Sequence, residues 1–175
     1  MYNAKRVSPH IGPMKILVVS DTHVPSLAQT LPSKLLEEAG SCEMILHAGD
    51  LVSMKVLNDL SRLAPVNAVR GNMDLPEVAR QLPSTRILSL DKWRIGLTHG
   101  HEGRGADTTE RARNGFSAKD ADCVVFGHSH VPSSGRVDGI LMFNPGSAVA
   151  GRGGQGNTFG ILHLGHKIET EIVAT

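Results

Sequence analysis

Aromatic side chains, cysteines and long apolar runs are all scarce in this chain of 175 residues. Only 3% of the residues are Phe, Trp or Tyr, which leaves no stacking platform for single-stranded nucleic acid. The net charge of +1 at pH 7 supplies no strong electrostatic field for nucleic acid or for an anionic membrane. The sequence therefore disfavours a nucleic-acid partner and predicts an aliphatic core.

Two cysteines, Cys42 and Cys123, are too few for a disulfide framework and suit a reducing compartment. No apolar stretch approaches the ~20 residues that a membrane-spanning helix needs. The first residues also lack the apolar segment of a secretory signal. We therefore expect a cytoplasmic protein without a membrane partner. Residues 1–13 are interpreted as a polar N-terminal extension, and residues 14–175 as a single domain.

Strand and helix patterns alternate in the first half of the chain. The expected elements are strands at Ile16–Val19, Met44–Leu46 and Val66–Val69, and helices at Pro32–Ala39 and from the N-cap Ser53 to Pro65. The second helix is expected to bury one face formed by Val56, Leu57, Leu60 and Leu63. This alternation predicts βαβ units and a parallel sheet.

From Thr85 onward the patterns are mostly those of strands. The expected elements are a hairpin of Arg86–Leu90 and Trp93–Thr98, a helix at Asp107–Phe116, and strands at Cys123–Phe126, Val131–Val137, Ile140–Phe143, Thr158–Leu164 and Lys167–Val173. Asp107 and Glu110 have the spacing of a capping box at the start of the helix. The whole chain is therefore expected to fold as an α/β protein with a strand-rich second half.

Polar side chains of the kinds that bind metals follow five of the apolar runs at the point where each ends. Asp21 and His23 lie two residues apart, and in an extended segment such residues face the same way. The complete set is Asp21, His23, Asp50, Asn72, His99, His128 and His130. Because ligands of open α/β sheets gather at the carboxyl ends of the strands, we expect these seven side chains to meet. Imidazole, carboxylate and amide groups without a thiolate suit two divalent ions of manganese, iron, zinc or nickel.

The motifs Asp-x-His, Gly-Asp, Gly-Asn, His-Gly-His and Gly-His-Ser-His, in this order, resemble those of the calcineurin-like metallophosphoesterases. In length, the chain is most similar to the small single-domain bacterial and archaeal phosphodiesterases of that family. The resemblance implies two packed mixed β-sheets flanked by helices, in a four-layer α/β/β/α sandwich. It also implies a division of the ligands, with Asp21, His23 and His130 on one ion, Asn72, His99 and His128 on the other, and Asp50 bridging both.

The resemblance further implies hydrolysis of a phosphodiester, for which two such ions predict in-line attack of a hydroxide that bridges them. The expected substrate is a small phosphoester, with a nucleotide or another small diester left open, and a homo-oligomer is compatible with the sequence. Many members of the family place a histidine, thought to assist the leaving group, where this chain has Met73. A thioether cannot donate a proton. His101 is the nearest alternative acid along the sequence.

Several features also have a simpler interpretation. The segment 151–156 matches the dinucleotide-binding pattern G-x-G-x-x-G, but it precedes a strand instead of joining a strand to a helix. The simpler interpretation is a mobile loop. The more specific alternative is a loop whose Arg152 contacts a phosphate at the mouth of the site. His47 is interpreted as a structural histidine, and the turn from Asn144 to Ser147 as a local support of the site. The alternative function is a non-catalytic protein-binding scaffold of the same fold, similar to the retromer subunit. The seven filled ligand positions favour the enzyme.

Overall fold

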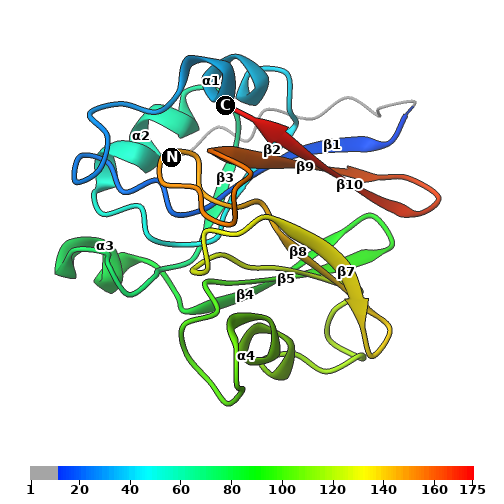
Figure 1. The fold of residues 1–175 in the computed structure, drawn as a ribbon. Helices are drawn as coiled ribbons and strands as arrows, with labels where there is room; N and C mark the ends of the chain where they lie inside the picture. The colour runs from blue at the N-terminus through cyan, green and yellow to red at the C-terminus, as the bar shows by residue number, and fades with distance from the viewer. Residues whose placement is uncertain (1–11) are drawn as a thin grey trace.

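Two five-stranded β-sheets packed face to face form the centre of the molecule, and helices cover their outer faces (Figure 1). The computed structural model of the protein describes residues 12–175. The first sheet has the strand order β10-β9-β1-β2-β3 and the second β4-β5-β6-β8-β7. Both sheets are mixed, and with α1 and α2 on one side and α4 on the other they make four layers. This architecture is the one that the resemblance implied.

The first sheet is built from both ends of the chain. Its strands are β1 (Met14–Val19), β2 (Met44–His47), β3 (Val66–Ala68), β9 (Thr158–Leu164) and β10 (Ile168–Ala174). Strands β1, β2 and β3 run parallel, joined through α1 (Ser33–Ala39) and α2 (Met54–Ser61). Because such crossovers are right-handed, both helices lie on the same face of the sheet, as Figure 1 shows. Strands β9 and β10 extend the sheet antiparallel beyond β1.

The second sheet comes from the continuous middle of the chain. Its strands are β4 (Thr85–Leu90), β5 (Trp93–Thr98), β6 (Cys123–Val125), β7 (Ser133–Val137) and β8 (Ile140–Asn144). Strands β5, β6 and β8 are parallel, whereas β4 and β7 are antiparallel edge strands. Helix α4 (Thr108–Asn114) connects β5 to β6 and covers the outer face. Within each sheet the parallel strands therefore have their carboxyl ends at the same edge, and the loops that follow them begin there.

Three groups of buried apolar side chains hold the four layers together. Alternate residues of β1 face opposite ways, so Leu17 and Val19 pack with the helices α1 and α2 while Ile16 and Val18 pack against the second sheet. A third group joins α4 to the outer face of the second sheet and includes Phe116. Most of these side chains are aliphatic, as expected, but all four phenylalanines of the sequence are also buried.

The two cysteines lie in these apolar layers as free thiols. Cys42 and Cys123 are both buried, and each packs there as a small hydrophobic residue. Burial raises the pKa of the Cys123 thiol to about 12. That thiol is therefore protonated at neutral pH.

Element boundaries differ from the expectations in a few places. Helix α3 (Pro76–Gln81) was not expected, because it has six residues and only Val78 is buried, too short a segment for a periodic pattern. The expected face of α2 was wrong at Leu63, since the helix ends at Ser61 and Leu63 is 40% exposed. Ser53 does occupy the N-cap, but its hydroxyl donates to the Val24 carbonyl. Residues 1–11 of the expected extension lie outside the described part of the chain.

Candidate metal centre

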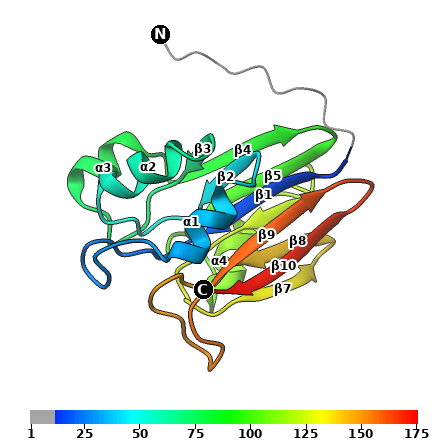
Figure 2. The ribbon, with the colours of Figure 1, turned by 90° about the horizontal axis from the view of Figure 1, so that it is seen from above.

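The seven predicted ligands follow five strands of two different sheets. Asp21 and His23 follow β1, Asp50 follows β2 and Asn72 comes after β3. The remaining ligands, His99, His128 and His130, follow β5 and β6 of the second sheet. The loops after these strands gather at one end of the sandwich, the end that carries the loop after β1 in Figure 2. The site is therefore assembled across the interface between the sheets.

One group of side chains surrounds Asp21, which is fully buried. Its Oδ1 atom lies 3.2 Å from His130 Nε2 and 3.9 Å from His23 Nε2. The two imidazole Nε2 atoms are themselves 3.4 Å apart. Asp21, His23 and His130 each offer a ligand atom within a sphere of metal-binding size, as the predicted division of the ligands requires.

A second group surrounds His99. Its Nε2 atom lies 3.3 Å from Asp50 Oδ2 and 3.1 Å from Asn72 Oδ1. The His128 ring packs edge-to-face against the His99 ring, and the two ring centroids lie 5.1 Å apart. Asp50 Oδ2 is also 3.7 Å from His23 Nε2. The Asp50 carboxylate therefore faces both groups, although Asp21 Oδ1, at 4.0 Å from His99 Nε2, reaches toward the second group as well.

Backbone strain is concentrated in these loops. Five of the seven predicted ligands have a positive φ, from 44° at His23 to 67° at His128; the others are Asp21, Asp50 and His130. A left-handed conformation costs a residue other than glycine on the order of 1–3 kcal/mol, and it persists where the surroundings over-determine it, most often at functional sites. The concentration of strain here supports a functional role for the loops.

The imidazoles are oriented with their Nε2 atoms toward the centre. His99 Nδ1 lies 2.8 Å from the Ala48 carbonyl, and His130 Nδ1 lies 2.8 Å from the Ala150 carbonyl. A carbonyl only accepts hydrogen bonds, so both Nδ1 atoms carry a proton and donate it. In the neutral form of each ring the Nε2 lone pair is then free to bind a cation, and such backbone bonds are typical around metal-binding histidines. The facing carboxylates, Asp50 for His99 and Asp21 for His130, outweigh burial and raise the pKa of both rings, so a cation at Nε2 would replace the proton that these carboxylates favour there.

The carboxylates also fit a cation. Asp21 Oδ1 is buried and makes no hydrogen bond, whereas its Oδ2 accepts the N–H of His128 at 3.0 Å. Burial alone would raise the pKa of Asp21, but the adjacent His130 and His99 imidazoles outweigh it and hold the pKa below its ordinary value. A buried anionic oxygen without a donor is costly. A divalent ion between the two carboxylates and the imidazoles would satisfy it.

The structure places the predicted auxiliary residues around this centre. The His101 ring lies 5.1 Å from the His99 ring, and its Nε2 faces Glu102 Oε1 at 3.3 Å. Burial and the neighbouring His99 lower the pKa of His101, which favours the neutral imidazole at neutral pH. The backbone N–H of Arg152 donates to the His130 carbonyl at 2.9 Å. Met73 donates its backbone N–H to Asp50 Oδ1, and the residue is 57% exposed.

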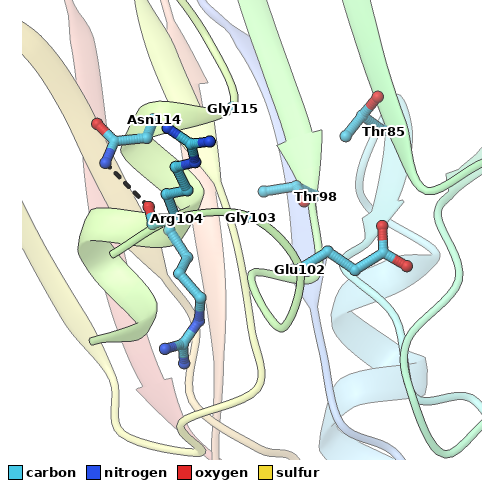
Figure 3. A pocket seen from close by; sticks show the side chains of 8 residues that line it. Thr85, Thr98, Glu102, Gly103, Arg104, Asn114 and Gly115 are labelled. Carbon is cyan, nitrogen blue, oxygen red and sulfur yellow. Dashed lines mark hydrogen bonds between the residues drawn. The ribbon is translucent and has the colours of Figure 1, made fainter. Parts of the chain in front are cut away.

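A cavity of about 560 Å³ lies beside the loop that carries His101. It is lined by Thr85, Thr98, Glu102, Gly103, Arg104, Arg111, Asn114 and Gly115. Figure 3 shows Thr85 and Glu102 on one side and Asn114, which donates to the Arg104 carbonyl, on the other. None of the seven predicted ligands lines it, so the cavity is adjacent to the centre rather than part of it.

His47 has the structural role that was predicted. Its ring is fully buried, with the Gly49 N–H 3.2 Å from Nδ1 and the Thr22 hydroxyl 3.1 Å from Nε2. Nδ1 accepts from Gly49, so Nε2 carries the proton and donates to Thr22 Oγ1. Burial lowers the pKa of His47 to about 3. The imidazole is therefore a neutral link between the loops after β1 and β2.

The turn after β8 supports the site more directly than the sequence indicated. The buried Ser147 hydroxyl donates to the Asp21 carbonyl at 2.7 Å and accepts the Ala150 N–H at 2.9 Å. The Asn144 side-chain amide donates to the Gly127 carbonyl and to the Ser129 hydroxyl, both in the loop that carries His128 and His130. Composition predicted the turn, but these bonds span up to 126 residues of sequence, and no local pattern encodes them.

A sandwich of two mixed sheets with carboxylates and imidazoles gathered at one end is the architecture of a metal-binding protein. The family model of the calcineurin-like phosphoesterase superfamily domain matches residues 14–167. The chain belongs to this superfamily, which is metal-dependent. It is 35% identical over 162 residues to a probable metallophosphoesterase of Methanothermobacter thermautotrophicus, covering 93% of each chain. Such relatives support the general activity of a phosphoesterase.

Solved structures give the same fold. An archaeal phosphodiesterase is 25% identical with a TM-score of 0.68, covering 91% of this chain and 100% of the other. Wild-type Vps29 of Entamoeba histolytica, solved with Zn²⁺, is also 25% identical, with a TM-score of 0.73 over 91% of this chain and 98% of that one. One neighbour is thus an enzyme by its description, and the other is a sorting protein that binds zinc.

Proposed function

We propose that the protein is a dinuclear metal-dependent phosphodiesterase. The observation that carries the proposal is the convergence of the Nε2 atoms of His23, His99 and His130 with two buried carboxylates, one of which has an oxygen without a hydrogen bond. With His128 and Asn72 the set has four imidazoles, two carboxylates and an amide, which exceed the needs of a single four-ligand site. Two ions share this set more naturally than one.

In this proposal each ion has its own ligands and Asp50 belongs to both. Asp21, His23 and His130 hold one ion, and Asn72, His99 and His128 hold the other. The placement of Asp50 Oδ2 between His23 and His99 supports its bridging role. When bound, two such ions lower the pKa of a water molecule and neutralise the charge that develops on the phosphoryl oxygens during in-line displacement. The ligand types are compatible with manganese, iron, zinc and nickel.

The chain's own residues then decide which ester it cleaves. Met73 stands beside Asp50 and cannot protonate a leaving oxygen. His101 is close to His99, but burial and His99 lower its pKa, which disfavours the protonated ring that a general acid needs. The leaving group must therefore depart largely unprotonated, which favours phenol-like leaving groups over alkoxides. Arg152 follows Ala150, whose carbonyl orients His130, and we assign it a contact with the substrate phosphate.

The substrate in this proposal is a small diester rather than a membrane lipid or a nucleic-acid duplex. A nucleotide is one member of that class. Within residues 12–175, no helix is long and apolar enough to cross a membrane. Two buried free thiols support a reducing compartment such as the cytoplasm, where disulfides are rare.

Turnover of an aryl phosphodiester by protein stripped of metal and then reloaded tests this function. Manganese, nickel, zinc and iron are supplied one at a time, with the matching phosphomonoester as comparison substrate. Activity that appears only with metal and favours the diester supports the proposal. A greater rate on the monoester would make the protein a phosphomonoesterase with the same centre.

The second candidate is a non-catalytic scaffold, and the likeness to Vps29 is the observation that favours it. Vps29 binds Zn²⁺, so metal content alone does not separate the two functions. Turnover does. Protein that holds two ions per chain and hydrolyses neither the diesters nor the monoesters would be the scaffold.

A further inference from the structure

Asp74 links two of the loops that carry predicted ligands. Its Oδ1 accepts the N–H of Val52 at 2.7 Å, and its Oδ2 accepts the N–H of Gly71, also at 2.7 Å. Val52 follows Asp50 by two residues, and Gly71 directly precedes Asn72. One half-buried carboxylate therefore joins the segment of the bridging ligand to the segment of the amide ligand.

A hydrogen bond in the opposite direction completes this link. Asp50 Oδ1 accepts the N–H of Met73, the residue next to Asp74, at 2.7 Å. The two loops thus exchange side-chain-to-backbone bonds, and the exchange leaves Asp50 Oδ2 free to face His23 and His99. The orientation of the Asp50 carboxylate depends on where residues 71–74 lie.

The backbone that Asp74 holds is strained. Val52 has φ 76° and Asp50 has φ 56°. A β-branched residue in the left-handed region is a true outlier, so contacts around Val52 must maintain it. Val52 donates its N–H to Asp74 and accepts the Leu75 N–H through its carbonyl at 3.2 Å. Both contacts come from the segment that begins at Gly71.

There is also no room for the loops to adjust independently. A Cβ atom placed on Gly71 would lie 2.1 Å from Asp50 Oδ1 and 2.5 Å from the Asp50 backbone nitrogen. The two segments are therefore in direct backbone contact, and only glycine permits this approach. The position of each ligand loop is therefore tied to that of the other.

We propose that Asp74 is a positioning residue of the metal centre, which fixes the separation of Asp50 and Asn72 by holding both loops at once. The inference rests on the proposed metal centre and names a residue that binds neither ion. Removing hydrogen-bond partners of this kind typically weakens metal affinity by about 10–100-fold.

Two variants distinguish a role of the Asp74 hydrogen bonds in positioning the loops from a role of its negative charge. Asp74→Asn keeps the shape and one acceptor oxygen, but it turns an NH₂ group toward one of the two N–H donors and loses that bond. Asp74→Ala loses both bonds. A positioning role predicts graded losses, about 10-fold weaker Mn²⁺ binding for asparagine and about 100-fold for alanine. A role through charge alone predicts equal losses in the two variants, because both are neutral.

Asp122→Asn is the matched control. The Asp122 carboxylate also accepts a backbone N–H, that of Arg94 at 2.8 Å. It directly precedes β6, whereas the predicted ligands follow that strand. This variant loses a comparable hydrogen bond at the far end of the sheet, and its Mn²⁺ affinity is expected to equal that of the unmodified protein.

The experiment is calorimetric titration of the full-length, metal-free proteins with Mn²⁺, together with the low-temperature electron paramagnetic resonance spectrum of the loaded forms. We expect graded loss of affinity and a smaller fraction of spin-coupled manganese pairs in the Asp74 variants alone. Equal loss in asparagine and alanine, no loss in either, or the same loss in Asp122→Asn overturns the inference and leaves the centre intact. If the unmodified protein binds no Mn²⁺, the same titrations are run with Zn²⁺, Fe²⁺ and Ni²⁺, and failure to bind any of the four ions overturns the proposed centre and this inference with it.

Discussion

The two sheets contribute differently to the centre. The first sheet supplies the three predicted oxygen ligands, Asp21, Asp50 and Asn72, together with the predicted ligand His23, whereas the second supplies only imidazoles. Each sheet also orients ligands of the other. His99 of the second sheet donates to the Ala48 carbonyl of the first. In the other direction, the His128 N–H and the Ser147 hydroxyl bind Asp21.

Neither sheet alone holds a complete half of the site. The Asp21 carboxylate is oriented by an N–H that follows β6, and the Asp21 backbone carbonyl by a hydroxyl that follows β8. The His99 ring is oriented by a carbonyl that follows β2. The ligand geometry therefore forms only when the sheets pack against each other. The apolar layer between them, which includes Ile16, Val18, Ile95 and Val125, thereby serves the centre as well as the fold.

The largest effect is expected from Asp50→Asn, which removes the carboxylate that faces both groups. An amide carries no charge and binds a cation weakly, so the affinity of the protein for both ions should fall. We expect turnover of an aryl diester to fall by on the order of 10³-fold, the upper range for loss of one electrostatic contact. Metal analysis alongside the rate measurement checks the bridging role. Full metal content in this variant would exclude it, and Asp59→Asn on the surface helix α2 is the control.

A smaller effect, restricted to poor leaving groups, is expected from Met73→His. The protein as it stands should show a steep dependence of rate on leaving-group pKa across a series of diesters. A histidine at this exposed position beside Asp50 supplies a proton donor, and general acids contribute about 10²–10⁴-fold. The variant should therefore flatten the dependence and speed the slowest esters most. A shallow dependence in the unmodified protein would mean that another group already protonates the leaving oxygen. If the dependence then became steep in His101→Ala, that group would be His101.

Ser147→Ala tests the bonds that the second sheet sends to the first. The change leaves the Asp21 carbonyl and the Ala150 N–H without their buried partner. Loss of such a partner costs about 1–3 kcal/mol. Chemical denaturation of the metal-free protein should show this decrease in the free energy of unfolding. Ser134→Ala, which removes an exposed hydroxyl contact to Thr170, should change it by less than about 0.5 kcal/mol. Equal effects in the two variants would mean that the buried bonds add nothing.

The smallest effect is expected on the pH dependence of stability and comes from His47, whose neutral ring links the loops after β1 and β2. The pKa of His47 is about 3 in the folded protein against 6.5 as the ordinary value. Between these values the unfolded chain binds a proton that the folded chain does not. The stability contributed by the neutral ring is full above pH 6.5 and is lost as the pH falls toward 3. His47→Gln should reduce the pH dependence of the unfolding free energy between pH 6 and 5 by about 1 kcal/mol per pH unit. An unchanged slope would contradict the lowered pKa.

Local patterns were sufficient for much of the fold and for the candidate ligands. The apolar runs before Asp21, Asp50 and His99 end in polar residues, and parallel strands place such ends at one edge. The predicted strand at Val66–Val69 ends at Ala68 and the one at Val131–Val137 begins at Ser133, differences of one or two residues. Such differences are usual for element ends.

Contacts between distant segments were not predictable in this way. The side chains of Asp74 and Ser147 act on backbone groups of other loops, and hydrophobic periodicity carries no information on those pairings. The strained φ of Val52 is likewise hidden, because its sequence pattern is that of an ordinary apolar residue. Such features depend on how the two sheets and their loops pack together.

In the proposed function, both sheets build one dinuclear centre that carries the activity. The most direct test is the rate of aryl diester hydrolysis as Mn²⁺ is titrated into metal-free protein at a concentration well above the dissociation constants. Two ions shared by one site predict a rate that rises until two equivalents per chain are bound and then stays constant. A plateau at one equivalent, or a rate that does not depend on metal, would contradict the account.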